Sequence, residues 1–443
     1  MNKQILTSIN AIAFLCCMLV LTACNKTEFL PDPEGAQIPF EPAGTQTVEE
    51  LLAASSAKLY YSAWQKSNIK DILKEKGPKL TLTVFAPDDA AMQNAGLSAS
   101  IIDQMPVEQL DSMVMFYTVI GNVTEDEIGM RSDNFVAKTM LSKPGLYARH
   151  YEGSDLGDID LYYYRHHLSI NDGQLFANGL STGALNYQPA TNGGLFVMGK
   201  TVERVSKTMM EVLMEDGRFT MFLEAMRLTD EMFLDKIASD IEPLFGYRPE
   251  PEEIKSGYAY ERKYYEKGLT VDPDLGYPQP NITISTVFAP TDEAFRKAGF
   301  QTLEDIRQFN IERGTAMFDE NTFQATGGYP MDTIFSYHRD WGRVDATKDP
   351  SYGIAADNAT IFYSNVLNAS LNNYMVNIGG TAQAIFAYKM PFDFSRNNSK
   401  IEMHIRGSEQ LPISLIETDI NTLNGPVHVV DELFLPKGFK IKK

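Results

Sequence analysis

The stretch TVFAPDDAAM at residues 83–92 returns as TVFAPTDEAF at residues 286–295, with seven of ten letters unchanged after 203 residues. Thr-Val-Phe is typical of a buried strand, and Ala-Pro ends that strand because proline lacks the N–H that a sheet ladder needs. Asp88 and Thr291 then stand where a helix N-cap is expected, followed by acids that meet the positive end of the helix dipole. The motif therefore predicts a strand-to-helix turn with a structural role.

Three further blocks recur in the same order, which predicts a tandem duplication of a whole domain. The matched blocks are TVEELL (47–52) with TMMEVL (208–213), LDSMVMFYTVIGNV (110–123) with MDTIFSYHRDWGRV (331–344), and NGGLFVMGKTVER (192–204) with NGPVHVVDELFLP (424–436). We call residues 45–207 the first repeat and residues 208–437 the second, with a tail at 438–443. The junction has no Pro/Gly linker, so the two domains are expected to abut.

These blocks resemble the fasciclin (FAS1) domain family, which has a pair of starting helices, a TVFAPTDEAF-like signature, a Tyr-His box and a closing NG.VHVVD strand. The second repeat shows all four, with Tyr337 and His338 as the box and His428 in the closing strand. The resemblance covers nearly the whole chain after its leader. It implies an α+β fold of two tandem domains, each a β-sandwich wedge with flanking helices, and a function in adhesion or extracellular binding, mostly without catalysis.

The first repeat departs from this family pattern at the same places. Its box reads Phe116-Tyr117, and Phe196 replaces the histidine of the closing strand. A fold that tolerates these changes does not depend on imidazole chemistry. Tyr337, His338 and His428 are therefore expected to pack and close the core.

The leader MNKQILTSINAIAFLCCMLVLTAC has one basic residue and an apolar run at residues 11–20. This run is shorter than the ~20 residues that a spanning helix needs, but it suits a secretory signal. The closing Leu-Thr-Ala-Cys resembles the bacterial lipoprotein box, which implies a signal peptide at 1–23 and a lipid on Cys24. The alternative is an ordinary signal cut after Ala23. All three cysteines lie in this leader, so the mature chain is expected to have no disulfide and no catalytic thiol.

Residues 24–44 are rich in Pro, Gly and acids, which is typical of an extended tether. They also resemble the leaders of lipoproteins displayed on bacterial surfaces, where acids soon after the cysteine favour export; here Glu28 is the nearest. We expect a protein anchored by Cys24 to the lipid of the outer membrane and exposed at the cell surface. Which face it occupies stays open in the sequence.

The formal net charge of −19 excludes an electrostatic footprint for nucleic acid. No dinucleotide, P-loop, metalloprotease or nucleophile-elbow motif occurs, so no cofactor, metal or catalytic residue is predicted. His166 and His167 are adjacent in a strand-like run and should point to opposite faces, which is poor geometry for a metal. Asp111-Ser112 and Asp332-Thr333 match a bacterial O-glycosylation pattern, with chance occurrence as the alternative.

The second repeat is longer than the first, and much of the excess is an insertion at about residues 239–284. Tyrosine offers a large ring and a hydroxyl, which suit both apolar and polar contacts. The predicted binding surface consists of four tyrosines of this insertion: Tyr258, Tyr260, Tyr264 and Tyr265. The alternative is a lid helix at about 253–267 whose tyrosines pack on the chain itself.

Function therefore has three interpretations. The first is a non-catalytic cell-surface lipoprotein that binds a protein or a glycan. The second is an accessory lipoprotein of an outer-membrane importer of the starch-utilisation type, which takes up glycans or peptides. The third, a hydrolase with paired carboxylates, has no distinctive pattern among the 58 acids.

Overall fold

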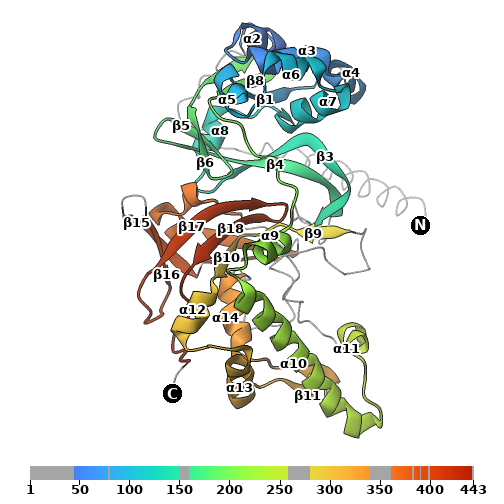
Figure 1. Cartoon of the computed structure of the whole chain (residues 1–443), viewed down its shortest axis with the longest axis vertical. Helices are drawn as coiled ribbons and strands as arrows, with labels where there is room; N and C mark the ends of the chain where they lie inside the picture. The colour runs from blue at the N-terminus through green and yellow to red at the C-terminus, as the bar shows by residue number, and fades with distance from the viewer. Residues whose placement is uncertain are drawn as a thin grey trace, which may run out of the picture. The chain divides into compact units, whose positions relative to one another are not determined.

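The computed structural model describes residues 44–77, 80–149, 159–257, 280–339, 361–381, 384–389, 391–397 and 400–441. Their fold is α+β, as the sequence predicted (Figure 1). In the first repeat the helices are α2 (Val48–Ala54), α3 (Lys58–Lys66), α4 (Ile69–Lys76), α5 (Asp89–Asn94), α6 (Ala99–Gln104), α7 (Val107–Phe116) and α8 (Glu125–Gly129). In the second they are α9 (Met209–Asp216), α10 (Thr220–Phe245), α11 (Pro251–Gly257), α12 (Asp292–Ala298), α13 (Leu303–Arg313) and α14 (Pro330–His338), with 3-10 turns η3 (Ser364–Val366) and η4 (Ala369–Asn373).

The strands of the first repeat belong to one sheet of order β6-β5-β4-β3-β2-β1-β8-β7. They are β1 (Leu82–Pro87), β2 (Thr118–Ile120), β3 (Phe135–Arg149), β4 (Ile159–Asn171), β5 (Gln174–Ala177), β6 (Leu180–Ala184), β7 (Tyr187–Ala190) and β8 (Gly193–Met198). Within the described ranges, no helix combines the length and the apolar character needed to cross a membrane.

The second repeat has a sheet of order β10-β18-β17-β16-β15 and two separate strand pairs, β11-β12 and β13-β14. Its strands are β9 (Asn281–Thr283), β10 (Val287–Pro290), β11 (Met317–Asp319), β12 (Gln324–Thr326), β13 (Met375–Thr381), β14 (Ala384–Lys389), β15 (Phe392–Asn397), β16 (Lys400–Ile405), β17 (Ile413–Thr422) and β18 (Gly425–Val430). Both repeats pair their first buried strand in parallel with their closing strand, β1 with β8 and β10 with β18.

The opening motif forms the strand-to-helix turn that was expected in both repeats. β1 and β10 are buried throughout, and Asp88 and Thr291 accept hydrogen bonds as N-caps of α5 and α12. The next acids do more than face the helix dipole. Asp89 Oδ1 accepts the backbone N–H of Leu59 at 2.7 Å, and Asp292 Oδ1 accepts that of Met221 at 2.7 Å. Each motif thus fixes the start of its repeat's second helix.

The closing block is tied to the first helix in the same way twice. Asn192 Oδ1 accepts the N–H of Val48 at 2.9 Å, and Asn424 Oδ1 accepts that of Met209 at 3.2 Å. The capping boxes Thr47–Glu50 and Thr208–Glu211 start these two helices. Because side chain, backbone partner and chain order all recur, the internal similarity in sequence is also a similarity in structure.

The boundary between the repeats is crossed by both a strand and a core. β9 pairs in parallel with β3, which makes a strand of the second repeat the ninth strand of the first repeat's sheet. Five buried residues of the second repeat join the first core: Ile282, Ile284, Ile361, Tyr363 and Leu423. Residues 43–443 form one compact unit. Residues after 207 thus complete the core of the first repeat. The domain limits that the sequence suggested stay predictions.

Shortening Ile282 tests this shared core. Ile282→Ala is expected to lower the free energy of unfolding of the first core by about 2–5 kcal/mol, the usual cost of a cavity at a fully buried isoleucine. The fluorescence of Trp64, which is buried in that core, reports the transition in a Trp341→Phe background. The exposed Leu411→Ala is the matched control. An unchanged Trp64 transition would show that the first core stands without β9.

Candidate functional site

The second repeat carries an extra lobe that the first lacks, which we call the inserted lobe: α10 from Phe233 onward, α11, β11 and β12 (Figure 1). At the equivalent place the first repeat has only the short helices α3 and α4. The lobe has a small core of its own, formed by Phe233, Leu234, Ile237, Ala238, Ile241, Ile254, Ala316 and Phe318. Two insertions that are separate in sequence thus meet in one structure.

Polar contacts hold the β11–β12 hairpin, and the chain that leads into α11, against α10. Asp240 Oδ2 accepts the N–H of Phe318 at 3.1 Å, which holds the β11–β12 hairpin. Arg248 donates to Ser239 Oγ at 3.0 Å and pairs with Asp235, which folds the chain back after the left-handed Gly246 cap. The Arg248 contacts are exposed and add little stability, whereas the Asp240 contact with the buried Phe318 is partly shielded from water.

The tip of the inserted lobe exposes aromatic rings. Phe245 and Phe323 are 45% and 56% exposed, and their ring centroids lie 6.0 Å apart. Both also contact the buried ring of Phe318. Leu244 and Tyr247 flank Phe245 in the chain and are exposed as well. Exposed apolar side chains that gather in this way mark interaction surfaces more often than isolated ones do.

Phe323 holds its position at a cost in backbone energy. Its φ is 55°, a region that bulky residues rarely occupy and that costs of the order of 1–3 kcal/mol. The preceding turn explains this value, because Asp319 accepts hydrogen bonds from the Asn321 N–H at 3.0 Å and the Thr322 hydroxyl at 2.8 Å. Glycine would adopt this turn without strain. The chain nevertheless carries phenylalanine there, so the ring is present in spite of its cost in backbone energy.

An open hollow of about 610 Å³ lies beside the lobe, between α10, α11 and α13. Charged side chains such as Asp235, Arg248 and Arg307 line it together with Ile254 and Ile311. α11 ends next to this hollow at Gly257. Tyr258, Tyr260, Tyr264 and Tyr265 lie outside the described residues, as does most of the insertion, and their binding role stays a prediction.

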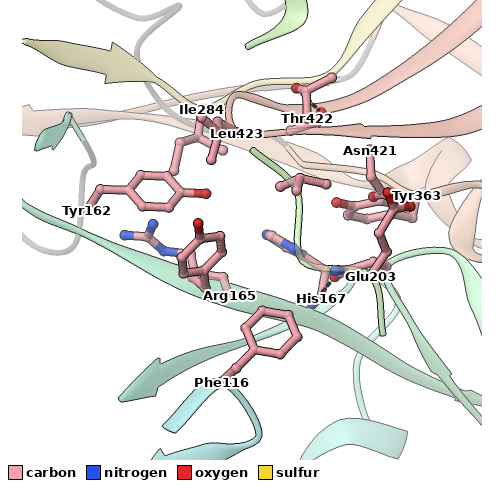
Figure 2. A pocket seen from close by; sticks show the side chains of 14 residues that line it. Phe116, Tyr162, Arg165, His167, Glu203, Ile284, Tyr363, Asn421, Thr422 and Leu423 are labelled. Atoms are coloured by element: carbon pink, nitrogen blue, oxygen red, sulfur yellow. Dashed lines mark hydrogen bonds between the residues drawn. The ribbon is translucent and has the colours of Figure 1, made fainter. Parts of the chain in front are cut away.

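A second, smaller cavity of about 30 Å³ lies where the repeats meet (Figure 2). Tyr162, Arg165 and His167 of β4 face Tyr363 and Asn421 of the second repeat across it. Neither ring nitrogen of His167 has a hydrogen-bond partner within the described residues, and the same holds for Asn421 Oδ1. The space suits one or two water molecules and excludes a sugar or a nucleotide.

The two adjacent histidines point to opposite faces of β4. His166 Nε2 bonds the carbonyl of Phe116 at 2.8 Å inside the first core, whereas the ring of His167 lies 5.2 Å from that of Tyr363. Burial lowers the pKa of His166 to about 4 and that of His167 to about 3. In the described part of the chain, no three His, Cys, Asp or Glu side chains gather as a metal site.

The Tyr-His box lies inside the second repeat. The ring of Tyr337 lies 6.2 Å from that of Phe392. His338 donates through Nδ1 to the carbonyl of Phe288 at 2.8 Å and accepts the N–H of Phe434 at Nε2, at 3.0 Å. These contacts fix a neutral ring, and burial lowers its pKa to about 3.

The first repeat fills the place of His338 with Tyr117. The hydroxyl of Tyr117 accepts the N–H of Val202 at 3.0 Å and donates to its carbonyl at 3.2 Å. Val202 is the counterpart of Phe434 in the aligned closing blocks. Two different side chains therefore hold the same backbone position.

His428 lies in β18 and stacks on Phe288, as Phe196 stacks on Phe85 in the first repeat. Its Nε2 donates to the carbonyl of Phe362 at 2.8 Å, and its Nδ1 accepts the N–H of Asp419 at 3.3 Å. Burial lowers its pKa, against the opposing effect of the Asp419 carboxylate. All of its contacts are internal to the fold.

The two glycosylation candidates differ in access. Asp111 accepts two hydrogen bonds from Asn68, and Ser112 is half-buried with its hydroxyl donated to the carbonyl of Glu108. Thr333 is exposed on α14. Their modification stays a prediction.

No protein-family model matches the chain, and no curated protein matches its sequence. Among solved structures, the chain is similar to a FAS1 domain pair from the insect cell adhesion molecule fasciclin I. The alignment covers 86% of this chain and 98% of that chain, at 10% sequence identity and a TM-score of 0.25. The α+β architecture and its internal repetition stand on the contacts described above.

The sequence did not single out the lobe tip. Only the growth of the alignment offset between residues 295 and 331 marked a second insertion there. Phe245 and Phe323 are 78 residues apart, and no local pattern links them.

Proposed function

We propose that this chain is a non-catalytic binding protein, anchored through a lipid on Cys24 at the outer face of the outer membrane. The tip of the inserted lobe contacts a partner protein or a glycan at the cell surface. The leader sequence supports the anchor, and the resemblance of the repeats to fasciclin domains supports an adhesive role.

One observation carries the proposed binding surface. Phe245 and Phe323 form an exposed ring pair on a lobe that the other repeat does without, and one of them is held at a strained φ. Aromatic rings lose little conformational entropy on binding, and they stack on sugar rings as well as on apolar protein surfaces. A rigid scaffold with an added aromatic tip therefore suits recognition better than catalysis.

Phe323→Gly separates a binding role from a structural one. Removing the ring should abolish capture of the surface partner, measured as attachment of cells that display the variant to glycan and matrix-protein arrays. Because glycine relieves the strain at φ 55°, the melting temperature should stay the same or rise.

The matched control is Leu411→Ser, which removes another exposed apolar side chain. It should leave both capture and melting unchanged. Capture that survives Phe323→Gly, or a clear fall in its melting temperature, would assign the ring to the fold. Co-purification of a stoichiometric β-barrel protein would instead identify the chain as an importer subunit.

A further inference from the structure

The first repeat has an open groove of about 560 Å³ on the side of α5, α6 and α7. Its lining is rich in methionine, with Met92, Met105 and Met113 beside Leu97 and Val202. None of these residues belongs to the lobe or to the cavity between the repeats. Phe116 lines both this groove and that cavity, but the other lining residues of the groove do not, so the groove is a surface without an assigned role.

The second repeat covers the equivalent surface with its own residues 439–441. Phe309 lies seven residues after the N-cap Thr302, as Met105 lies seven after the N-cap Ser98. The ring of Phe439 lies 6.2 Å from that of Phe309, and Ile441 packs on the same core.

An arginine clamp completes this covered surface. Arg313 donates to the carbonyl of Ile441 at 3.3 Å and also to that of Lys440. The fold itself thus shows what suits this surface, namely a peptide with apolar side chains two residues apart.

Chain connectivity explains why the first groove stays open. In the second repeat Gly438, at φ 72°, lets the tail reverse, with the N–H of Phe439 donating to the carbonyl of Pro436 at 3.0 Å. The aligned position in the first repeat is Ser206, from which the chain continues to the α9 cap at Thr208. A left-handed turn is costly for serine, so no local segment folds back.

The difference in burial agrees with this comparison. Phe300 and Phe309 are only 3% and 7% exposed in the second repeat, whereas their counterparts Leu97 and Met105 are half-buried. Methionine side chains adapt to varied apolar ligands. Arg204 is exposed at the groove, where its guanidinium can donate to the carbonyls of a bound chain.

From these contacts we infer that the methionine groove binds a segment of a partner polypeptide with apolar side chains at positions i and i+2. The tail of a second copy is the weaker occupant, because its own site offers two phenylalanines and Arg313 in place of Leu97 and Met105. That a partner exists follows from the proposed binding function, on which this inference rests. The groove is a second binding surface on the same chain.

The probe is a synthetic peptide of residues 435–443, LPKGFKIKK, added to the purified chain with labelled methionine methyl groups. The methyl chemical shifts of Met92, Met105 and Met113 should change as the peptide is added, and their titration should give a Kd of about 1 mM or tighter. Met105→Glu should weaken binding at least about tenfold, because it places a charge in the apolar groove. Met130→Glu, at an 80% exposed methionine, should leave binding unchanged.

A peptide with Phe439→Ser and Ile441→Ser keeps the positive charge and controls for attraction to an acidic protein. If Met105→Glu melts early, the uncharged Met105→Gln replaces it, with a smaller loss of binding expected. Absence of methyl shifts, equal binding of the serine peptide, or full binding by the Met105 variants each overturns the inference. The Phe323→Gly chain should bind the peptide as the unchanged chain does. Peptide binding therefore tests the groove, whereas partner capture tests the lobe, and either proposal can fail without the other.

Discussion

Lowering the pH from 7 to 5 is expected to cost this protein most of its stability, with an acid unfolding midpoint near pH 5. The cause is a set of four buried histidines that the fold holds neutral: His166, His167, His338 and His428. The rings of His338 and His428 are fixed by carbonyl acceptors and backbone N–H donors, and His167 also faces the positive charge of Arg165.

The sign follows from proton uptake. An unfolded histidine has a pKa of about 6.5, whereas the folded rings have a pKa of about 3 to 4 where burial is complete. Below pH 6.5 the unfolded chain binds protons that the folded chain excludes, so the free energy of unfolding falls as the pH falls towards 4. Each ring contributes about 1.4 kcal/mol per pH unit, hence about 2 kcal/mol by pH 5. Three such losses, at His166, His167 and His338, rival a typical net stability of about 5–15 kcal/mol, and the lowered pKa of His428 acts in the same direction.

His167→Phe should flatten this dependence by one proton. The ring of phenylalanine keeps the contact with Tyr363 and removes two nitrogens that find no hydrogen-bond partner among the described residues. Denaturant unfolding between pH 7 and 5 should then show a loss smaller by about 2 kcal/mol. Leu411→Ser, at an exposed position that carries no titratable group, should leave the slope unchanged. Equal slopes for the two variants would contradict the prediction.

Cys24→Ser is expected to move the protein from the membrane fraction to the soluble fraction. Cys24 lies outside the described residues, and the prediction rests on the Leu-Thr-Ala-Cys box. Without the thiol no lipid is attached, and a protein with net charge −19 is repelled by anionic lipid. Fractionation with a palmitate analogue should show loss of both the label and membrane association.

Cys17→Ser is the matched control, because it changes a leader cysteine that the box does not use. It should leave the label and the fraction unchanged. Continued labelling of Cys24→Ser would place the lipid elsewhere, and a membrane-bound but unlabelled variant would indicate an uncleaved leader.

The sequence predicted the elements whose causes are local. The two TVFAP motifs state their strand, its end and the N-cap within ten residues, and the α5 and α12 caps confirm them. Capping boxes at Thr47 and Thr208 are equally local. The duplication followed because these signals recur in order, and the α+β class was what the resemblance of the repeats to FAS1 domains implied.

The candidate sites depend instead on contacts between distant segments. Phe245 and Phe323 meet only because two insertions share a core with α10. The carbonyl of Phe362 lies 66 residues from His428, and the N–H of Phe434 lies 96 residues from His338, so no pattern around the histidines reveals these partners.

By itself, the amino-acid sequence determined the repeated strand-to-helix turns, because each rests on residues within a few positions of one another, and for the same reason it predicts the anchor at Cys24. The tertiary structure decided that β9 completes the first sheet, that the lobe exposes an aromatic tip, and that one groove is covered while its twin is open. The last difference comes from chain connectivity: the chain turns back at Gly438 so that Phe439 packs on Phe309, whereas Ser206 must lead into the next helix.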